Sequence, residues 1–272
     1  MSELRVEFGD CRRLLKELPK ASIKLIVTSP PYNLEKKYGL YKDSVPLEQW
    51  TELIDEVLKD SHDVLSADGS FFLNLSPIPD KKTSEIIPLE SIAWQLAKRH
   101  GYFLRNTIVW HFNNMQNCVN RLSGRWESVL WFVKDINKYT FNLDEVRIPV
   151  LTKNDKRFDA SRGRNPTDVW YFDRVNNMTK KKYGITAPCV YPVPLIERII
   201  KMASNEGDWI LDPFLGSGTT LVACKKTNRN GVGFEIDSKY EKTIEKRLEI
   251  GQEALDNKTK LTFNVKSIAA QA

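Results

Sequence analysis

Cysteine and histidine are scarce in this sequence, which contains four of the first and three of the second among 272 residues. The cysteines are far apart and form no CxxC pair, as their positions show: Cys11, Cys118, Cys189 and Cys224. Zinc sites and disulfide frameworks need such ligands at close, regular spacing. The sequence therefore predicts no metal site and no disulfide scaffold, and we interpret these residues as core or surface residues.

Long apolar stretches are also missing. No run approaches the roughly 18 apolar residues that a membrane-spanning helix requires. The start of the chain, Met1 to Arg5, lacks the charged-then-apolar pattern of a secretory signal. A hydrophobic content of 41%, with 10% aromatic and 28% charged residues, is typical of a soluble globular protein. We therefore expect a cytoplasmic protein without a membrane partner.

The positive charge of the chain is concentrated in one segment. The formal net charge is +6. The stretch from Lys134 to Lys182 holds 12 Lys and Arg against 7 Asp and Glu, a local balance of +5, with aromatic residues interleaved. A solvated, variable surface and a footprint for nucleic acid both explain such a segment. Charge alone does not separate these two interpretations.

Strand-like apolar runs alternate with segments of helical periodicity along the chain. We predict strands at residues 4–8, 23–27, 70–75, 102–112, 128–133, 209–211 and 231–236, and helices at residues 11–18, 47–65, 92–98, 194–203, 218–226 and 239–250. This alternation predicts an α/β fold in which helices cover both faces of a mostly parallel sheet. Periodicity fades between about 134 and 184, which indicates an inserted segment, and the last 20 or so residues carry no clear pattern.

A glycine-rich loop, Asp212 to Thr220, follows one predicted strand and precedes a helix. Gly216 and Gly218 would let a ligand approach the backbone closely. The loop lacks the lysine of a phosphate-binding P-loop. Glu235, at the end of the next strand, is well placed to accept hydrogen bonds from both hydroxyls of a ribose. The alternative is a glycine turn that serves only the packing of the sheet.

A second loop, Thr28 to Tyr32, follows the predicted strand at 23–27. Its two prolines remove two backbone donors, so we expect the carbonyls of the loop to face the site and stay free to accept. Ser29 adds a hydroxyl and Tyr32 a flat ring. A planar base with an exocyclic amine would suit this group of acceptors beside an aromatic face. The alternative is a proline turn capped by a buried tyrosine.

Together, the two loops resemble those of the amino-methylating DNA methyltransferases of restriction–modification systems, which use S-adenosyl-L-methionine. The Thr-Ser-Pro-Pro-Tyr loop precedes the Asp-Pro-Phe-x-Gly-Ser-Gly-Thr-Thr loop, which is the permuted order of the beta group. Four further segments are similar to motifs of the same family: residues 9–15, 127–134, 165–170 and 191–200. The resemblance covers most of the chain and is strongest to cytosine-N4-specific members.

The resemblance implies a circularly permuted, Rossmann-like methyltransferase sheet with one antiparallel hairpin strand. Residues 1–134 would form the catalytic half of the core, and residues 185–272 the cofactor-binding half. Residues 135–184 would form a small target-recognition insert, helped by the loop at 113–125. The candidates for reading guanine edges are Arg157, Arg162, Arg164 and Arg174.

The same resemblance assigns roles to residues of both loops. Ser29 and the Pro30 carbonyl would hold the target amine, and Tyr32 would stack on the base; the implied catalytic residues are Ser29, Pro30, Pro31 and Tyr32. Asp212 would lie near the amino group of the cofactor, and Phe214 would pack on its methionine part. The implied cofactor-binding residues are Asp10, Cys11, Pro192, Asp212, Pro213, Phe214, Gly216, Gly218, Thr219 and Glu235.

Two features favour cytosine N4 as the methyl acceptor. In this family Ser-Pro-Pro-Tyr usually accompanies cytosine N4, whereas Asp or Asn in the first position accompanies adenine N6. The Tyr191–Pro192 pair also resembles cytosine-N4 members. The neutral hydroxyl of Ser29 does not by itself exclude adenine. Adenine-N6 methylation, an RNA or small-molecule substrate, and a non-catalytic DNA-binding module on a methyltransferase core stay open as alternatives.

The resemblance also implies partners and a location. The partner is double-stranded DNA in the cytoplasm of a bacterial or archaeal cell. A cognate restriction endonuclease is compatible with this interpretation. So is a homodimer, because beta-group relatives are often dimers. The sequence does not determine which DNA site is recognised.

Overall fold

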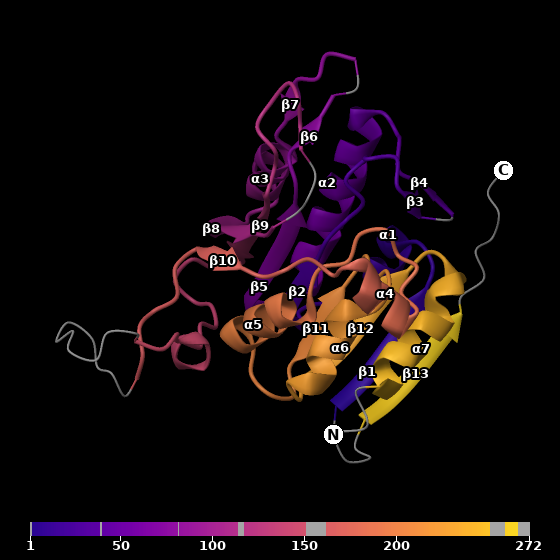
Figure 1. Cartoon of the computed structure of the whole chain (residues 1–272). Helices are drawn as coiled ribbons and strands as arrows, with labels where there is room; N and C mark the ends of the chain where they lie inside the picture. The colour runs from indigo at the N-terminus through magenta and orange to yellow at the C-terminus, as the bar shows by residue number, and fades with distance from the viewer. Residues whose placement is uncertain are drawn as a thin grey trace.

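A nine-stranded sheet forms the centre of the protein (Figure 1). The computed structural model describes residues 2–38, 40–80, 82–113, 117–150, 162–250 and 259–265. The strand order is β10-β8-β9-β5-β2-β11-β12-β1-β13. The strands are β1 (Ser2–Phe8), β2 (Ile23–Thr28), β5 (Leu65–Leu75), β8 (Phe103–His111), β9 (Trp126–Val133), β10 (Val169–Tyr171), β11 (Trp209–Asp212), β12 (Asn230–Glu235) and β13 (Thr259–Val265). Within this sheet β9 runs antiparallel to β5 and β8, and the other neighbours pair in parallel.

Helices cover both faces of the sheet (Figure 1). On one face α2 packs against both α1 and α3, and on the other α6 packs against both α5 and α7. These helices are α1 (Cys11–Glu17), α2 (Leu47–Val64), α3 (Leu89–Arg99), α5 (Val193–Ala203), α6 (Thr219–Lys226) and α7 (Glu241–Ile250). A short helix, α4 (Asn177–Tyr183), lies against α7. No helix in the described ranges is long and apolar enough to cross a membrane.

Small elements complete the fold. Two-stranded ribbons join β3 (Lys37–Tyr38) to β4 (Tyr41–Lys42), and β6 (Ile78–Pro79) to β7 (Ile86–Ile87). Single 3₁₀ turns lie at Leu143–Val146 and Ser238–Tyr240.

The core has two layers because the central strands are buried on both faces. Side chains of a strand alternate between faces. In β2, Leu25 and Val27 belong to the cluster under α5 and α6, whereas Ile26 belongs to the cluster under α2 and α3. Ile210 and Leu211 of β11 divide in the same way. This double burial explains why these strands are almost continuously apolar in the sequence.

The predicted α/β fold, with a mostly parallel sheet and one antiparallel strand, is confirmed. The predicted elements are present with their ends shifted by a few residues, and the largest shift is in β5. Asp68 and Gly69, which the prediction placed between the helix at 47–65 and the strand at 70–75, lie inside β5. Both residues lie close to Lys24 of the neighbouring strand β2. Lys24 pairs with Asp68 at 2.5 Å, and a side chain at Gly69 would come within 3.0 Å of the Lys24 carbonyl.

Two strands of the central sheet, β10 and β13, were missing from the sequence prediction. β13 extends the sheet beyond β1, in parallel, although no clear pattern was assigned to the last residues. Residues 260–265 do alternate between polar and apolar types, which is the signal of a strand with one buried face. That alternation could have located β13.

The basic segment at 135–184 is more closely joined to the core than the prediction of an insert implied. Its strand β10 pairs in parallel with β8 and so extends the central sheet. Trp170, in β10, is only 3% exposed, and Arg198 of α5 lies 4.7 Å from its ring centroid. Trp170 is therefore a core residue and does not belong to an exposed aromatic surface. Arg157 lies outside the described residues, and target recognition by this segment stays a prediction.

Candidate active site

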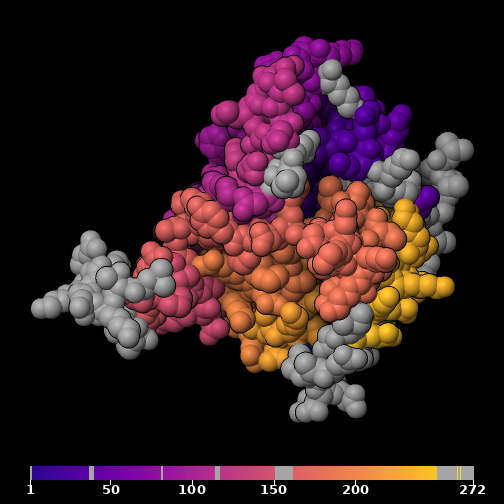
Figure 2. Space-filling model, in the orientation of Figure 1, coloured from indigo at the N-terminus to yellow at the C-terminus, as the bar shows by residue number. Residues whose placement is uncertain are grey.

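A cavity of about 910 Å³ opens beyond the carboxyl ends of β1, β2, β5, β11 and β12. In Figure 2 the surface is hollowed where the indigo and magenta segments meet the orange one. Both loops predicted from the sequence line the cavity, and so do parts of residues 118–127 and 174–191. A volume of this size is typical of sites for small molecules and cofactors.

Most of the predicted site residues line this one cavity, although they come from distant parts of the chain. They are Asp10, Cys11, Ser29, Pro31, Tyr32, Pro213, Phe214, Gly216, Thr219 and Glu235. Four predicted residues are not among those that line the cavity, namely Pro30, Pro192, Asp212 and Gly218. The two loops therefore meet as predicted, but some of their residues serve the framework behind the wall.

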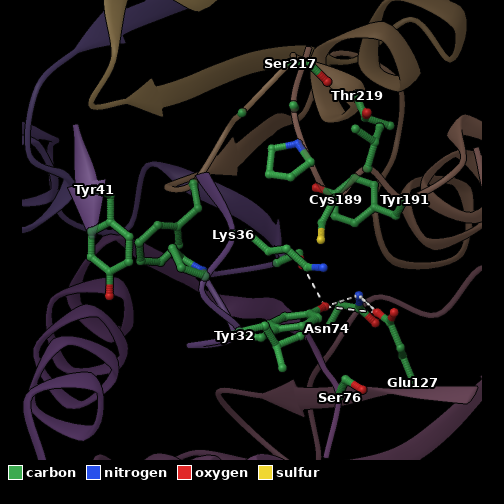
Figure 3. Close-up of a pocket in the computed structure, with 18 of the residues that line it drawn as sticks. Tyr32, Lys36, Tyr41, Asn74, Ser76, Glu127, Cys189, Tyr191, Ser217 and Thr219 are labelled. Carbon is green, nitrogen blue, oxygen red and sulfur yellow. Dashed lines mark hydrogen bonds between the residues drawn. The ribbon is translucent and has the colours of Figure 1, made fainter. Parts of the chain in front are cut away.

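The catalytic loop is held by side chains outside the motif. Tyr32 is 6% exposed, and its hydroxyl lies 2.7 Å from Ser29 Oγ and 3.0 Å from Glu127 Oε2. Asn74 Nδ2 donates to the same hydroxyl at 2.6 Å. Figure 3 shows Tyr32, Asn74 and Glu127 directed toward one another. Burial, and next the charge of Glu127, raise the pKa of Tyr32 well above its usual value, so this hydroxyl keeps its proton.

One expectation about the loop carbonyls is wrong. The carbonyls of the proline pair were both expected to stay free to accept from a ligand. The Pro31 carbonyl instead accepts a hydrogen bond from Trp50 Nε1 of α2, at 2.7 Å. Trp50 is fully buried, and a buried indole N–H needs a partner. This bond anchors the loop on α2 and removes the Pro31 carbonyl from the set of free acceptors.

Gly216 and Gly218 differ in what surrounds them. Both have left-handed backbone, with φ of +55° and +84°. A side chain at Gly216 would meet nothing within 4 Å, and Gly216 lines the cavity. A side chain at Gly218 would lie 3.2 Å from Ile244 of α7. Gly216 therefore leaves room for a ligand. Gly218 is the N-cap of α6, packs near Ile244 and is not among the residues that line the cavity, so its approach to the cofactor stays a prediction.

Glu235 ends β12 and lies opposite Gly216. Its Oε2 accepts from the Gly216 backbone N–H at 2.8 Å, and its Oε1 accepts from the Asp237 N–H at 2.9 Å. Burial raises the pKa of Glu235 to about 7, and the nearby acids Asp237 and Asp212 add to the shift. Each carboxylate oxygen can accept a further hydrogen bond. Glu235 can thus bind two hydroxyl groups while it holds the loop in place.

Asp212 is fully buried and has its partners inside the protein. Its Oδ1 accepts from Thr28 Oγ1 at 2.6 Å and from the Phe214 N–H at 3.1 Å. Its Oδ2 accepts from Tyr191 at 2.8 Å and from Thr220 at 2.5 Å. Asp212 is not among the residues that line the cavity, and its implied position near the cofactor amino group stays a prediction. Asp212 ties the end of β2 to the glycine-rich loop.

The other predicted residues have local roles that are clear in the structure. Asp10 caps α1 by accepting from the Arg12 N–H at 2.9 Å. Burial alone would raise the pKa of Asp10, but hydrogen bonds and charge from Arg12 lower it, so Asp10 is a carboxylate at the cavity wall. Burial raises the pKa of the Cys11 thiol, which keeps it neutral. Pro192 is the N-cap of α5 and lies behind the wall.

Sequence reasoning gave no role to Asn74 and Glu127, which line the cavity, or to Arg247, which bonds to the glycine-rich loop. Arg174, a predicted candidate for reading guanine edges, also lines the cavity. Asn74 and Glu127 are polar residues at the ends of the apolar strands β5 and β9, so the rule that ligands bind at strand ends could have found them. Arg247 donates to the Ser217 carbonyl at 2.8 Å and to Thr219 Oγ1 at 3.0 Å. Burial lowers the pKa of Arg247 to about 10. Arg247 lies in α7, where acidic and basic residues alternate, so the sequence did not distinguish it from the other charged residues of that helix.

Positively charged side chains line the cavity. Arg12 and Lys36 come from the N-terminal half, Arg121 from the loop at 117–125, and Arg174 and Lys180 from the basic segment. Loop residues Val119 and Leu122 are 97% and 93% exposed. Arg121, Arg174 and Lys180 thus bring positive charge to the cavity from the two segments that the sequence links to DNA, and Leu122 adds an exposed apolar side chain from the loop.

Comparison with known proteins identifies similar sequences. A family model described as DNA methylase matches residues 23–246. The type II methyltransferase M.ScaI of Streptomyces caespitosus is 33% identical over 261 residues, which cover 93% of this chain and 84% of that protein.

Solved structures share the fold. The cytosine-N4-specific PvuII DNA methyltransferase has a TM-score of 0.74 at 22% identity, covering 95% of this chain and 88% of that one. TTHA0409 of Thermus thermophilus, solved in complex with S-adenosyl-L-methionine, has a TM-score of 0.66 at 24% identity, covering 97% and 99%. The fold is therefore that of S-adenosyl-L-methionine-dependent DNA methyltransferases.

Proposed function

The chain belongs to the DNA methylase family, and from that premise we propose that it methylates the exocyclic N4 amine of a cytosine flipped out of duplex DNA. The methyl donor is S-adenosyl-L-methionine. One observation carries the proposal: a single cavity joins Ser29 and Tyr32 with Gly216 and Glu235. The first pair holds an amine-bearing base and the second pair a nucleoside, so that the two meet inside the cavity.

The residues of the glycine-rich loop fit the cofactor. Gly216 leaves open space where a side chain would point, and Phe214 offers an apolar surface on the same wall. Glu235 has acceptor capacity for both ribose hydroxyls, and Asp10 adds a second carboxylate. When bound, the cofactor supplies an electrophilic methyl group on a sulfonium centre. The chain's own residues then have to bind, orient and exclude water, and no metal is required.

The catalytic loop positions the base. A nucleotide leaves the duplex at a cost of a few kcal/mol. Stacking on an aromatic ring such as Tyr32 returns roughly 1–3 kcal/mol. Ser29 would hold the exocyclic amine in line with the methyl group that the bound cofactor would supply, and the proton that the amine loses on methylation would pass to solvent. Because the amine lone pair is delocalised into the base, an acceptor at Ser29 helps to localise it for in-line attack.

Ser29 supports cytosine as the target. The loop reads Ser-Pro-Pro-Tyr, which resembles cytosine-N4 members of the family. The Tyr191–Pro192 pair points the same way by resemblance, although Tyr191 bonds to Asp212 and Pro192 lies behind the wall. Adenine-N6 methylation uses the same cofactor and geometry, and it is the second outcome that the test distinguishes.

The cationic wall supports a DNA partner. Lys and Arg neutralise phosphates in a way that does not depend on sequence, and bases are then read by specific contacts. Arg121, Arg174 and Lys180 line the cavity from the two segments linked to recognition. We further propose a cytoplasmic restriction–modification role, with a cognate endonuclease as partner and a homodimer as the assembly.

Nucleoside mass spectrometry tests the proposal. The protein is incubated with unmodified bacterial DNA and S-adenosyl-L-methionine, and the DNA is digested to nucleosides. We expect a gain of N4-methylcytosine. A gain of N6-methyladenine would keep the fold, cofactor and cavity but overturn the assignment of the base to Ser29. No methylated nucleoside, in DNA or in an RNA control, would overturn the proposed activity, and loss of cofactor binding would favour a non-catalytic DNA-binding module.

A further inference from the structure

Four polar side chains from three parts of the chain form one hydrogen-bonded network at the catalytic loop. Ser29 Oγ lies 2.7 Å from the Tyr32 hydroxyl, which donates to Glu127 Oε2 at 3.0 Å. Asn74 Nδ2 donates to both the Tyr32 oxygen, at 2.6 Å, and Glu127 Oε2, at 2.8 Å. All four residues line the cavity, and Figure 3 labels Tyr32, Asn74 and Glu127.

The donors and acceptors in this network fix the direction of the Ser29 hydroxyl. A tyrosine hydroxyl has one proton, and a carboxylate can only accept. The strongest acceptor within reach of Tyr32 is Glu127, so the Tyr32 proton points to Glu127. Asn74 contributes an N–H and leaves the Tyr32 oxygen as an acceptor. The contact between Ser29 and Tyr32 then requires Ser29 to donate, because Tyr32 has no second proton.

We propose that Glu127 is a positioning residue for the target base, acting through Tyr32 to turn the Ser29 proton away from the cavity. The lone pairs of Ser29 Oγ then face the cavity, and Ser29 receives the exocyclic amine as a hydrogen-bond acceptor. This inference rests on the proposed function and explains how a neutral hydroxyl serves there. The carboxylate that orders the acceptor comes from β9, far along the chain from the catalytic loop.

Burial and pairing fix the position of Glu127. The Glu127 side chain is 6% exposed, and its Oε1 accepts from Arg174 at 3.0 Å. Arg174 also lies over the ring of Phe112, 4.4 Å from its centroid. One carboxylate oxygen therefore serves the catalytic loop, while the other binds the basic segment. A charged hydrogen bond of this kind is stronger than a neutral one and holds the carboxylate in a single orientation.

Glu127→Gln tests the role of the charge with little change of shape. An amide has one acceptor oxygen and one donor nitrogen. If its oxygen faces Tyr32 and Asn74, its NH₂ faces Arg174; the reverse orientation places donors against Tyr32 and Asn74. We expect kcat to fall about 10- to 100-fold, with the KM for cofactor and the calorimetric cofactor affinity unchanged. Glu52→Gln, on the exposed side of α2, is the matched control and should keep wild-type kcat.

A double-mutant cycle with Tyr32→Phe separates positioning from general loss of structure. Phenylalanine keeps the ring but removes the hydroxyl through which Glu127 acts. We expect Tyr32→Phe to lower kcat by a similar factor, and Glu127→Gln to add less than about twofold in the Tyr32→Phe background. If the two substitutions instead damaged the structure independently, their fold-reductions in kcat would multiply in the double variant. Melting temperature and cofactor affinity are measured for every variant, so that a misfolded protein is recognised.

The outcomes distinguish this inference from the proposed function. If the wild-type protein methylates DNA but Glu127→Gln matches it in kcat, or if the two substitutions multiply, the role of Glu127 is overturned and the methyltransferase activity stands. If the wild-type protein methylates no amine, both proposals fail. A low kcat at unchanged cofactor affinity, with non-multiplying effects, would support Glu127 as the positioning residue.

Discussion

The two walls of the cavity use their motif residues in different ways. On the catalytic wall Ser29 and Tyr32 reach the cavity with their own side chains and are ordered by Asn74 and Glu127 from elsewhere. On the cofactor wall Asp212 and Gly218 turn inward to the framework. There the surface offered to a ligand comes from Gly216, Phe214 and Glu235.

This difference follows from what each wall has to bind. A cofactor offers many polar groups and a large surface, which a fixed backbone and one carboxylate can match. A flipped base offers one reacting amine, whose orientation depends on a single acceptor. Conservative substitutions on the catalytic wall, such as Tyr32→Phe, should therefore reduce turnover more than stability. Substitutions of inward-facing residues on the cofactor wall should reduce stability first.

Tyr32→Ala should have the largest effect on turnover. It removes both the stacking surface and the hydroxyl that orders Ser29, and together these effects predict a loss of about 1,000-fold in single-turnover methylation. Affinity for duplex DNA should remain within about threefold, because phosphate contacts carry most of it. Methylation with labelled cofactor and fluorescence anisotropy with duplex DNA measure the two quantities. Unaltered turnover would remove Tyr32 from the mechanism.

Asp212→Ala should instead destabilise the fold. The substitution leaves the hydroxyls of Thr28, Tyr191 and Thr220 without their common buried acceptor. We expect the free energy of unfolding to fall by about 3 kcal/mol, and cofactor affinity to weaken because the loop loses its anchor. Denaturant titration and calorimetry measure these changes.

Asp63→Ala is the control for that experiment, because Asp63 pairs with Lys20 at an exposed position. Its effect should stay within about 0.5 kcal/mol. If Asp212→Ala weakened cofactor binding at full stability, Asp212 would act on the cofactor itself, consistent with the position near its amino group that the resemblance implied, and the contrast between the walls would fail.

The pH dependence of cofactor affinity should report on Glu235. Its pKa is raised to about 7, so the carboxylate that accepts from ribose hydroxyls is lost as the pH falls through this value. Between pH 8 and pH 6 we expect the affinity to weaken by about 10-fold, with most of the change below the pKa. Calorimetry at several pH values measures it. Glu235→Gln should bind more weakly and give a flat profile; an unchanged slope would assign the titration to another group.

The sequence predicted where the site lies better than which atoms form it. Strand periodicity located the loops after β2 and β11, and parallel strands brought the two loops to one edge of the sheet. The motif did not reveal that the Pro31 carbonyl bonds to Trp50, because that contact depends on how α2 packs. Glu127 was part of a recognised segment without a role, since its partner Tyr32 is distant in sequence and meets it only through the antiparallel pairing of β9 with β5.

Gly216→Ala and Gly218→Ala give the smallest and most direct comparison within one loop. Both require alanine to adopt left-handed backbone, which costs about 1–2 kcal/mol each. Gly218→Ala also presses on Ile244 at 3.2 Å, so it should lower the unfolding free energy more. Gly216→Ala places a methyl group in the cavity and should weaken cofactor binding about 10-fold, whereas Gly218→Ala should change it by less than about threefold. Denaturation and calorimetry of both variants decide the point: if Gly218→Ala weakened binding more, Gly218 would belong to the ligand-facing surface after all.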